Sequence, residues 1–296
     1  MKKILVEVLC WLIELKNWLI NDIMLKPIKP KIISSKETVK LIIDGRYSIS
    51  RFGDGEFALI FGRNLKFQQY STTIRDELKR ILRSKESNLL IGIPDIFGNN
   101  LLYTSSARNY WDKYLHSNRN RIYKVLNLKK QYYDSLMTRF YMDYADKAGA
   151  NEKIILLKKI WDGRKVLIVE GKKSRLGMGN DLFCNADSIE RLICPSENAY
   201  EKIDIIQSLI EMKKDDTDLV LIALGPTATC LSHRLFKKGI QAVDIGHIDI
   251  EYEWFLDGAS KKKPVSGKYI GEIPDGDLVG DKTDDLYRQQ IWRIVE

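Results

Sequence analysis

The sequence is poor in cysteine and histidine, and this scarcity excludes several common kinds of site. Its 296 residues contain four cysteines, which lie far apart and form no Cys-x-x-Cys pair, and three histidines. A structural zinc site needs such residues clustered at short spacing, so none is expected. With no secretory signal and no paired cysteines, the pattern indicates a reduced, cytoplasmic chain.

The sequence also lacks an uninterrupted hydrophobic run long enough to cross a membrane. Residues 4–24 are mostly apolar, but Glu7, Glu14 and Lys16 interrupt them. A spanning helix is therefore not expected. Because no cleavage site of small residues follows the run, a signal peptide is not expected either.

Residues 4–24 instead predict an amphipathic helix, which the proline-containing segment 26–31 ends. Its polar side chains gather on one narrow stripe: Lys3, Glu7, Glu14, Asn17 and Asn21. In one interpretation, residues 1–24 make peripheral contact with the inner face of the cell membrane, with Trp11 and Trp18 at headgroup depth. In the other, the helix docks on the domain or on a second subunit. The docked helix is favoured because such stripes usually face a core.

The net charge of +8 is unevenly distributed. Residues 1–150 hold 26 Lys and Arg against 15 Asp and Glu, whereas the rest hold 22 against 25. A basic first half indicates an anionic partner, such as nucleic acid, a membrane surface or a phosphorylated ligand. Nucleic acid is not expected, because there is no RNP-type aromatic motif, zinc-finger spacing or sustained basic stripe.

From residue 32 to 258, short apolar runs alternate with amphipathic stretches. The sequence predicts helices at 34–44, 73–84, 151–161, 197–213 and 227–238, and a mainly helical stretch at 103–147. It predicts strands at 48–50, 88–94, 165–170, 189–194, 219–224 and 241–245. The expected fold is α/β and Rossmann-like, with a mostly parallel sheet covered by helices on both faces. Residues 259–296 are expected to be a polar extension that packs on this domain.

An Asp-x-Glu pair, Asp54 and Glu56, follows the first strand of this domain between two glycines. Two carboxylates on such a turn can converge on Mg²⁺ or Mn²⁺, which prefer oxygen ligands. A cation held there would suit a diphosphate, with Arg51 and Gly53 beside it. The alternative is an ordinary turn whose acids face water.

Two later strand ends carry the features of an anion site. Glycines with basic and polar side chains follow strand 165–170, and a glycine opens helix 227–238, where free amides can bind an anion. The candidate cofactor-binding residues are Glu170, Gly171, Lys173, Arg175, Gly177, Gly179, Asn180, Asp181, Gly225 and Thr227. Neither segment is a Walker loop or a strict G-x-G-x-x-G. The alternatives are a solvated basic loop and a simple helix cap.

His247, Asp249 and Glu251 follow the last predicted strand, 241–245, and their side chains share one face if this stretch is extended. Such a cluster could bind a metal, accept a proton from a hydroxyl group or hold a sugar. A single histidine in a structural role is the alternative.

Four ordered motifs give the chain a resemblance to the bacterial glycosyltransferases of the GT-D fold, first known as a domain of unknown function in adhesin glycosylation clusters. The motifs are residues 51–56, 170–181, 223–228 and 246–254, and the similarity extends over about residues 34–257. The resemblance implies a Rossmann-like domain that binds a UDP-sugar, typically UDP-glucose. It also implies that Asp54 and Glu56 hold Mn²⁺ or Mg²⁺ at the diphosphate.

The expected function is therefore transfer of a hexose from a UDP-sugar to a glycan or glycoprotein acceptor, in glycoprotein or cell-surface polysaccharide synthesis. Arg51, Lys173 and Arg175 would neutralise the leaving diphosphate. Asp249 or Glu251 would accept the acceptor proton, with His247 orienting a carboxylate, binding the donor or completing the metal shell. Two alternatives are a Rossmann-type S-adenosylmethionine-dependent methyltransferase and a non-catalytic partner of another transferase.

Overall fold

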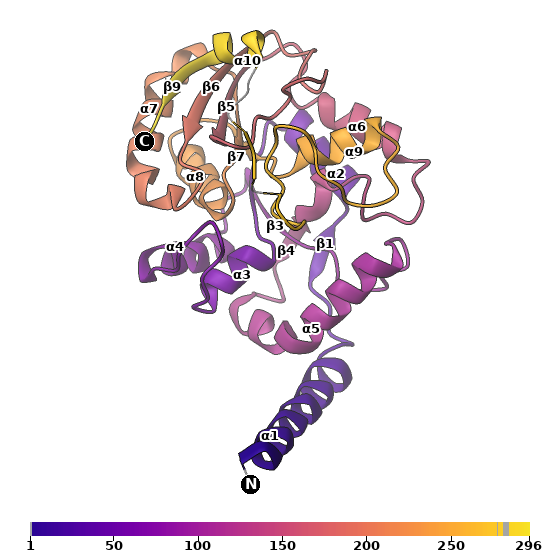
Figure 1. Cartoon of the computed structure of the whole chain (residues 1–296). Coiled ribbons are helices and arrows are strands. Elements are labelled where there is room, and N and C mark those ends of the chain that lie inside the picture. The colour runs from indigo at the N-terminus through magenta and orange to yellow at the C-terminus, as the bar shows by residue number, and fades with distance from the viewer. Residues whose placement is uncertain (1, 277, 281–283) are drawn as a thin grey trace.

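A nine-stranded parallel sheet forms the centre of the computed structural model, which describes residues 2–276, 278–280 and 284–296 (Figure 1). The strand order is β1-β4-β3-β2-β8-β7-β5-β6-β9. The strands are β1 (Lys31–Ile33), β2 (Ser48–Arg51), β3 (Leu89–Ile93), β4 (Gln131–Asp134), β5 (Lys165–Gly171), β6 (Ser188–Cys194), β7 (Leu219–Ala223), β8 (Ala242–Asp244) and β9 (Ile291–Ile294). Each neighbouring pair is parallel.

Helices cover both faces of the sheet, as the sequence predicts. The α-helices are α1 (Lys2–Asn17), α2 (Ser35–Asp44), α3 (Asp54–Ile60), α4 (Thr72–Leu82), α5 (Ser105–Val125), α6 (Ala150–Lys158), α7 (Ile203–Met212), α8 (Pro226–Lys237), α9 (Ile248–Leu256) and α10 (Asp285–Gln290). One apolar core includes residues from α3, α4, α5, α7 and α8, and the other includes residues from α2, α6 and α9. Successive residues of β7 alternate between the two cores, which explains why this strand is apolar throughout.

Three edge or near-edge strands, β1, β4 and β9, were not predicted from the sequence. Each has only three or four described residues, and polar side chains interrupt them, so no buried apolar run marks them. Strand β9 pairs with β6. The residues after 258 thus contribute to the sheet and do not form only a polar extension.

Residues 247–251 are not extended, because α9 begins at Ile248, so the condition under which His247, Asp249 and Glu251 would share one face is not met. Strand β8 ends at Asp244, and Gly246 adopts a φ of +45°, a left-handed conformation that stops an extended chain. Asp249 and Glu251 then lie in the first turn of α9, where negative side chains are favoured. A period of 3.6 residues places them on different sides of the helix.

The amphipathic helix is present, but its first part does not dock on the domain. Figure 1 shows α1 standing clear of the body below α5. A π-helical segment, η1 (Trp18–Met24), continues α1 and contacts α5. In the described part of the chain, no helix is both long enough and apolar enough to cross a membrane.

The order of the strands brings two halves of the chain together at the middle of the sheet. Residues before 135 build β1 to β4, residues after 164 build β5 to β9, and β2 pairs with β8 where the halves meet. Because the strands are parallel, the loops that follow β2, β4, β5, β7 and β8 all emerge at the carboxyl ends of the strands. Ligands bind at this end in open parallel sheets.

Candidate active site

A cavity of about 960 Å³ lies at the carboxyl ends of the central strands. Its wall includes residues at or directly after strand ends: all of 51–56 at β2, four residues within 171–176 at β5, all of 223–226 at β7 and four residues within 246–250 after β8. Thr104, Ala107 and Tyr110 of the α5 region form another side. The C-terminal part of the chain completes the wall with Ser260, Lys261, Lys262, Tyr269, Gly271 and Glu272. A volume of this order is sufficient for a nucleotide-sized ligand.

Asp54 and Glu56 both line this cavity, in the first turn of α3. Glu56 accepts a hydrogen bond from the backbone amide of Gly53 at 2.6 Å, which closes the helix end. Asp54 is exposed and accepts a hydrogen bond from the Tyr110 hydroxyl. Burial, together with the nearby carboxylates of Asp244 and Asp54, raises the pKa of Glu56 to about 7 despite the Gly53 amide.

The acidic pair fits a divalent cation that is shared with a ligand. In the described parts of the chain, no three histidine, cysteine or acidic side chains form a complete metal site. Mg²⁺ is commonly held by one or two carboxylates together with substrate phosphates and water. Asp54 and Glu56 can supply those two carboxylates, and a cation beside Glu56 would favour the carboxylate form that burial and the neighbouring acids disfavour.

Arg51 organises the loops around the acidic pair. Its guanidinium donates hydrogen bonds to the Ser135 carbonyl at 2.8 Å and the Thr138 hydroxyl at 2.7 Å, and pairs with Asp244 at 3.0 Å. A Cβ on Gly246 would lie 2.1 Å from an Arg51 guanidinium nitrogen, so only glycine fits there. Arg51 thus joins the ends of β2, β4 and β8. Its buried Nε has no hydrogen-bond partner among the described residues.

The loop after β5 places Gly171 and Lys173 on the cavity wall, whereas its other candidate residues contact the protein itself. Glu170 is fully buried and accepts a hydrogen bond from the Leu176 amide at 2.7 Å. The remaining contacts of this loop are from Arg175 to the Gly267 carbonyl, from the Gly177 amide and Asn180 to Asp249, and from Lys158 and Tyr252 to Asp181. Gly179 adopts a φ of +76°. These residues fix the shape of the loop.

At the β7–α8 turn, Gly225 lines the cavity and Thr227 does not. Gly225 has a φ of +53°, and a Cβ there would lie 2.7 Å from the Phe67 ring. Thr227 is fully buried, and its hydroxyl lies 3.5 Å from the Gln68 side-chain oxygen. The positive end of α8 therefore faces the cavity beside an aromatic side chain.

His247 and Asp249 reach the cavity wall, whereas Glu251 does not. Asp249 lies 2.7 Å from the Lys268 ammonium and accepts hydrogen bonds from the Gly177 amide and Asn180. Glu251 accepts hydrogen bonds from the backbone amides of residues 141 and 142, at 3.0 and 2.8 Å. Burial raises the pKa of both carboxyl groups. Burial, with the nearby Arg139 cation, lowers the pKa of His247 to about 4, so the imidazole is neutral near pH 7.

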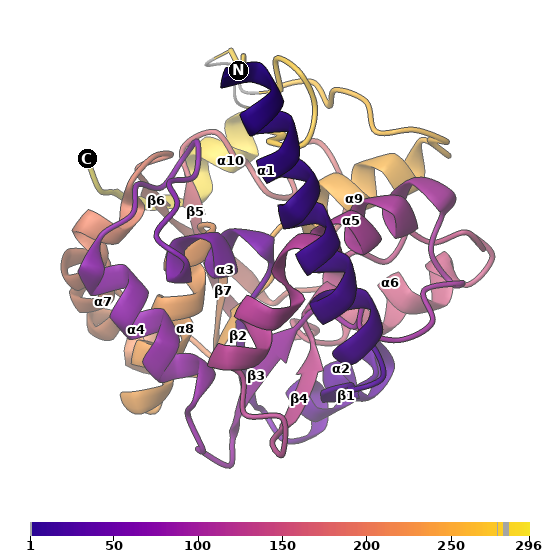
Figure 2. The same cartoon turned by 90° about the horizontal axis from the view of Figure 1, so that it is seen from below.

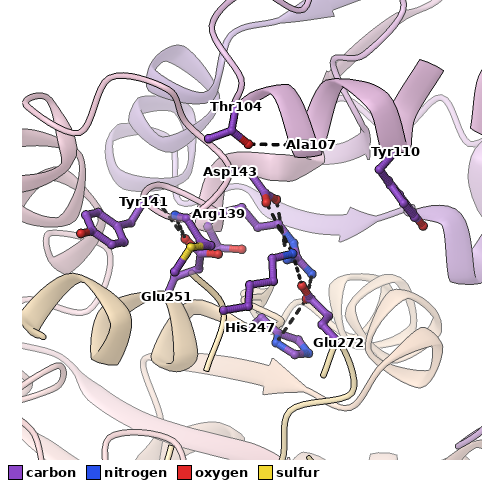
Figure 3. Close-up of polar contacts among 12 residues, drawn as sticks. Thr104, Ala107, Tyr110, Arg139, Tyr141, Asp143, His247, Glu251 and Glu272 are labelled. Carbon is purple, nitrogen blue, oxygen red and sulfur yellow. Dashed lines mark hydrogen bonds and ion pairs between the residues drawn. The ribbon is translucent and has the colours of Figure 1, made fainter. Parts of the chain in front are cut away.

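A cluster of charged residues beside His247 was not predicted from the sequence (Figure 3). Glu272 forms ion pairs with Arg139 and, at 2.5 Å, with Lys262, and His247 lies 3.7 Å from Glu272. Asp143 lies 3.9 Å from Arg139 and 3.4 Å from Lys262. Opposite charges thus alternate along this wall. These residues come from segments without a motif, so only their position in the fold reveals them.

Comparison with known proteins identifies the family. The family model described as "Glycosyltransferase GT-D fold" matches residues 49–273, which include Asp54, Glu56 and the loops after β5 and β7. The chain belongs to this GT-D family.

Two solved structures share the fold over nearly their whole length. One is described as "The highly conserved domain of unknown function 1792 has a distinct glycosyltransferase fold" and is 35% identical, with a TM-score of 0.88 over 92% of this chain and 98% of that chain. The other, "A New Glycosyltransferase (DUF1792) from Streptococcus sanguinis", is 34% identical, with a TM-score of 0.86 over 90% of this chain and 100% of that chain. The α/β fold expected from the resemblance is confirmed.

Two bacterial relatives are longer proteins. "Glycosyltransferase GlyD" of Streptococcus pneumoniae is 36% identical over 95% of this chain and 34% of its own length. "Probable glycosyl transferase Gly" of Streptococcus gordonii is 37% identical over 88% of this chain and 38% of its own length. The chain thus spans about a third of the length of the curated relatives that it matches.

Proposed function

We propose that this GT-D chain is a metal-dependent glycosyltransferase that moves a hexose, glucose first among the candidates, from a UDP-sugar to a glycan or glycoprotein acceptor. One observation carries the proposal. The Asp54 and Glu56 carboxylates share one cavity with the Gly171–Lys173 and Gly225 strand ends. A diphosphate in this cavity would meet a cation on one side and backbone amides with a lysine on the other.

Asp54 and Glu56 would hold Mn²⁺ or Mg²⁺, which when bound supplies positive charge for the departing UDP. Lys173 and the Arg51 Nε can donate further hydrogen bonds to the diphosphate, because both residues line the cavity. Arg175 is buried and contacts the Gly267 carbonyl, so its proposed role becomes the shaping of the loop after β5. The apolar wall at Phe67 and Leu224 offers a surface for a nucleobase.

Of the two carboxylates proposed as the base, the geometry favours Asp249. It lines the cavity, and its raised pKa brings proton acceptance closer to neutral pH. Glu251 instead holds the backbone that precedes Asp143. Neutral His247 and the ion-paired Glu272 lie nearby and can hold the hydroxyl groups of a sugar.

The first experiment is a screen of UDP-sugars for UDP release by the full chain, with Mn²⁺, with Mg²⁺ and with a chelator. We expect release from UDP-glucose that requires metal, and a loss of about 100-fold or more in Asp54→Ala and Glu56→Gln, because several kcal/mol of charge stabilisation would disappear. The control is the D215A/D216A variant, which removes an exposed acidic pair that is not part of the cavity. Normal turnover in both site variants would contradict the assignment of the metal.

The same preparation separates the two alternatives. A thermal shift by S-adenosylmethionine, without one by UDP plus Mn²⁺, would indicate a methyltransferase. Donor hydrolysis that is absent in the isolated chain but appears with a second transferase would indicate a non-catalytic partner.

A further inference from the structure

The N-terminal helix presents an unusually large apolar surface to solvent. In the described part of the chain, 23 large hydrophobic side chains are exposed, and 12 of them lie between residues 5 and 24. They are Leu5, Val6, Val8, Leu9, Trp11, Leu12, Ile13, Leu15, Trp18, Leu19, Ile23 and Met24, which we call the apolar face. None of them belongs to either core. A continuous exposed patch of this kind marks an interaction surface.

The polar side of the helix is held by α5, so the apolar face points outward. The Asn21 side chain donates to the His116 carbonyl at 2.6 Å and accepts from the Asn120 amide at 2.8 Å. The His116 ring lies between Glu14 and Asp22, at 2.9 and 2.6 Å. Figure 2, seen from below, shows the axis of α1 crossing in front of α5. The domain therefore holds the C-terminal part of the helix, through Glu14, Asn21 and Asp22.

The width of the apolar face favours a bilayer over a second helix as the partner that covers it. At about 100° per residue, its eight members in α1 cover roughly three fifths of the helix circumference. A partner helix from a second copy would cover a stripe only about 100° wide and leave the rest in water. The boundary between lipid headgroups and acyl chains can cover the whole face, and Trp11 and Trp18 are typical of that depth.

The charge around the helix fits anionic headgroups. Residues 1–31 contain six lysines against three acidic residues, and α5 contains five basic residues, of which Arg119 is buried, against one acidic residue. These two segments therefore carry +7 of the net charge of +8. Each basic residue close to an anionic surface adds about 1 kcal/mol of attraction, so the apolar and electrostatic contributions act together.

We propose that α1 and η1 lie in the headgroup boundary of an anionic phospholipid bilayer and attach the protein to its surface. Helix α5 links this attachment to the cavity, because His116 and Asn120 hold η1 while Ala107 and Tyr110 line the cavity. The attachment would therefore present the cavity at a defined distance from the bilayer. The inference stands independently of the proposed donor, since it concerns a separate surface.

Vesicle sedimentation of the full chain tests the attachment. We expect the protein to sediment with vesicles of phosphatidylglycerol and phosphatidylcholine in equal parts, and much less with phosphatidylcholine alone. The W11E/L15E variant should bind at least about 10-fold more weakly, because two apolar side chains are lost and two negative charges are gained. The matched control is M212E/L256E, which changes exposed apolar residues outside the helix. It should bind like the unchanged chain.

Three results would overturn the proposal. The first is an unchanged chain that stays in the supernatant with anionic vesicles. The second is equal vesicle binding by the W11E/L15E variant. The third is a vesicle-free dimer in light scattering that this variant converts to a monomer, which would assign the apolar face to a second copy. UDP release measured on the same variant without vesicles distinguishes failure of the attachment from failure of the proposed function, because the two substitutions lie outside the cavity.

Discussion

Asp249 and Glu251 lie two residues apart, yet their contacts predict different effects of substitution. Asp249→Asn should lower kcat about 100-fold or more with UDP affinity largely retained, because an amide cannot accept the acceptor proton. Glu251→Gln should mainly lower the free energy of unfolding, by about 1–3 kcal/mol, because its carboxylate receives two buried backbone hydrogen bonds. Steady-state kinetics, UDP titration and urea unfolding of both variants measure these effects. A slow but stable Glu251→Gln enzyme would reverse the assignment.

Individual site residues could be predicted from the sequence only where a motif marks them. Arg51, Asp54 and His247 all line the cavity, as expected of residues at strand ends. Arg139 and Glu272 gave no signal, because they are far apart in the chain and meet only through the fold. A motif also cannot show which way a side chain points. Glu170 sits among motif residues, but its carboxylate faces the interior.

At the scale of elements, the junction between η1 and α5 should depend on pH. The carboxylates of Asp22 and Glu14 raise the pKa of His116 above its ordinary value of 6.5 by favouring the imidazolium. A raised folded-state pKa stabilises the junction fully below pH 6.5, and this contribution is lost as the pH rises through the folded-state pKa. We therefore expect weaker protection of residues 14–24 above that pKa.

Hydrogen exchange, corrected for the intrinsic effect of pH on exchange rates, measures this protection. His116→Gln is the control, because glutamine cannot titrate and its profile should be flat. The same pH dependence in both proteins would show that another group controls the junction.

Whole elements were predicted well where burial sets the sequence pattern. Strands β5 and β7 lie inside the sheet and are mostly apolar, and β6 ends in an apolar run, so the positions of all three agree with the predicted strands within one or two residues. Strands β1 and β9 lie at the sheet edges, where one side stays exposed and no continuous apolar run is needed. In α9, acidic and apolar residues alternate as in a strand, but Gly246 and the packing of the helix against its core override that pattern.

At the scale of the molecule, the described residues after 258 belong to the folded domain. Glu170 of β5 pairs with Arg191 of β6 at 2.7 Å and accepts a hydrogen bond from Tyr287 of α10 at 3.0 Å. Lys268 forms an ion pair with Asp249, and Glu272 forms one with Arg139, and both of these partners line the cavity. The sequence suggested an extension because these residues are polar, but their charges are balanced by partners from distant parts of the chain.

The Glu170–Arg191 pair should therefore be a large determinant of stability. Both side chains are almost fully buried, so Arg191→Met would leave a buried carboxylate without its cation and lower the free energy of unfolding by about 3–5 kcal/mol. Lys238→Met, which breaks the exposed pair with Glu211, should cost at most about 1 kcal/mol. Urea unfolding compares the two variants. Equal losses would mean that Tyr287 and the Leu176 amide satisfy Glu170 without Arg191.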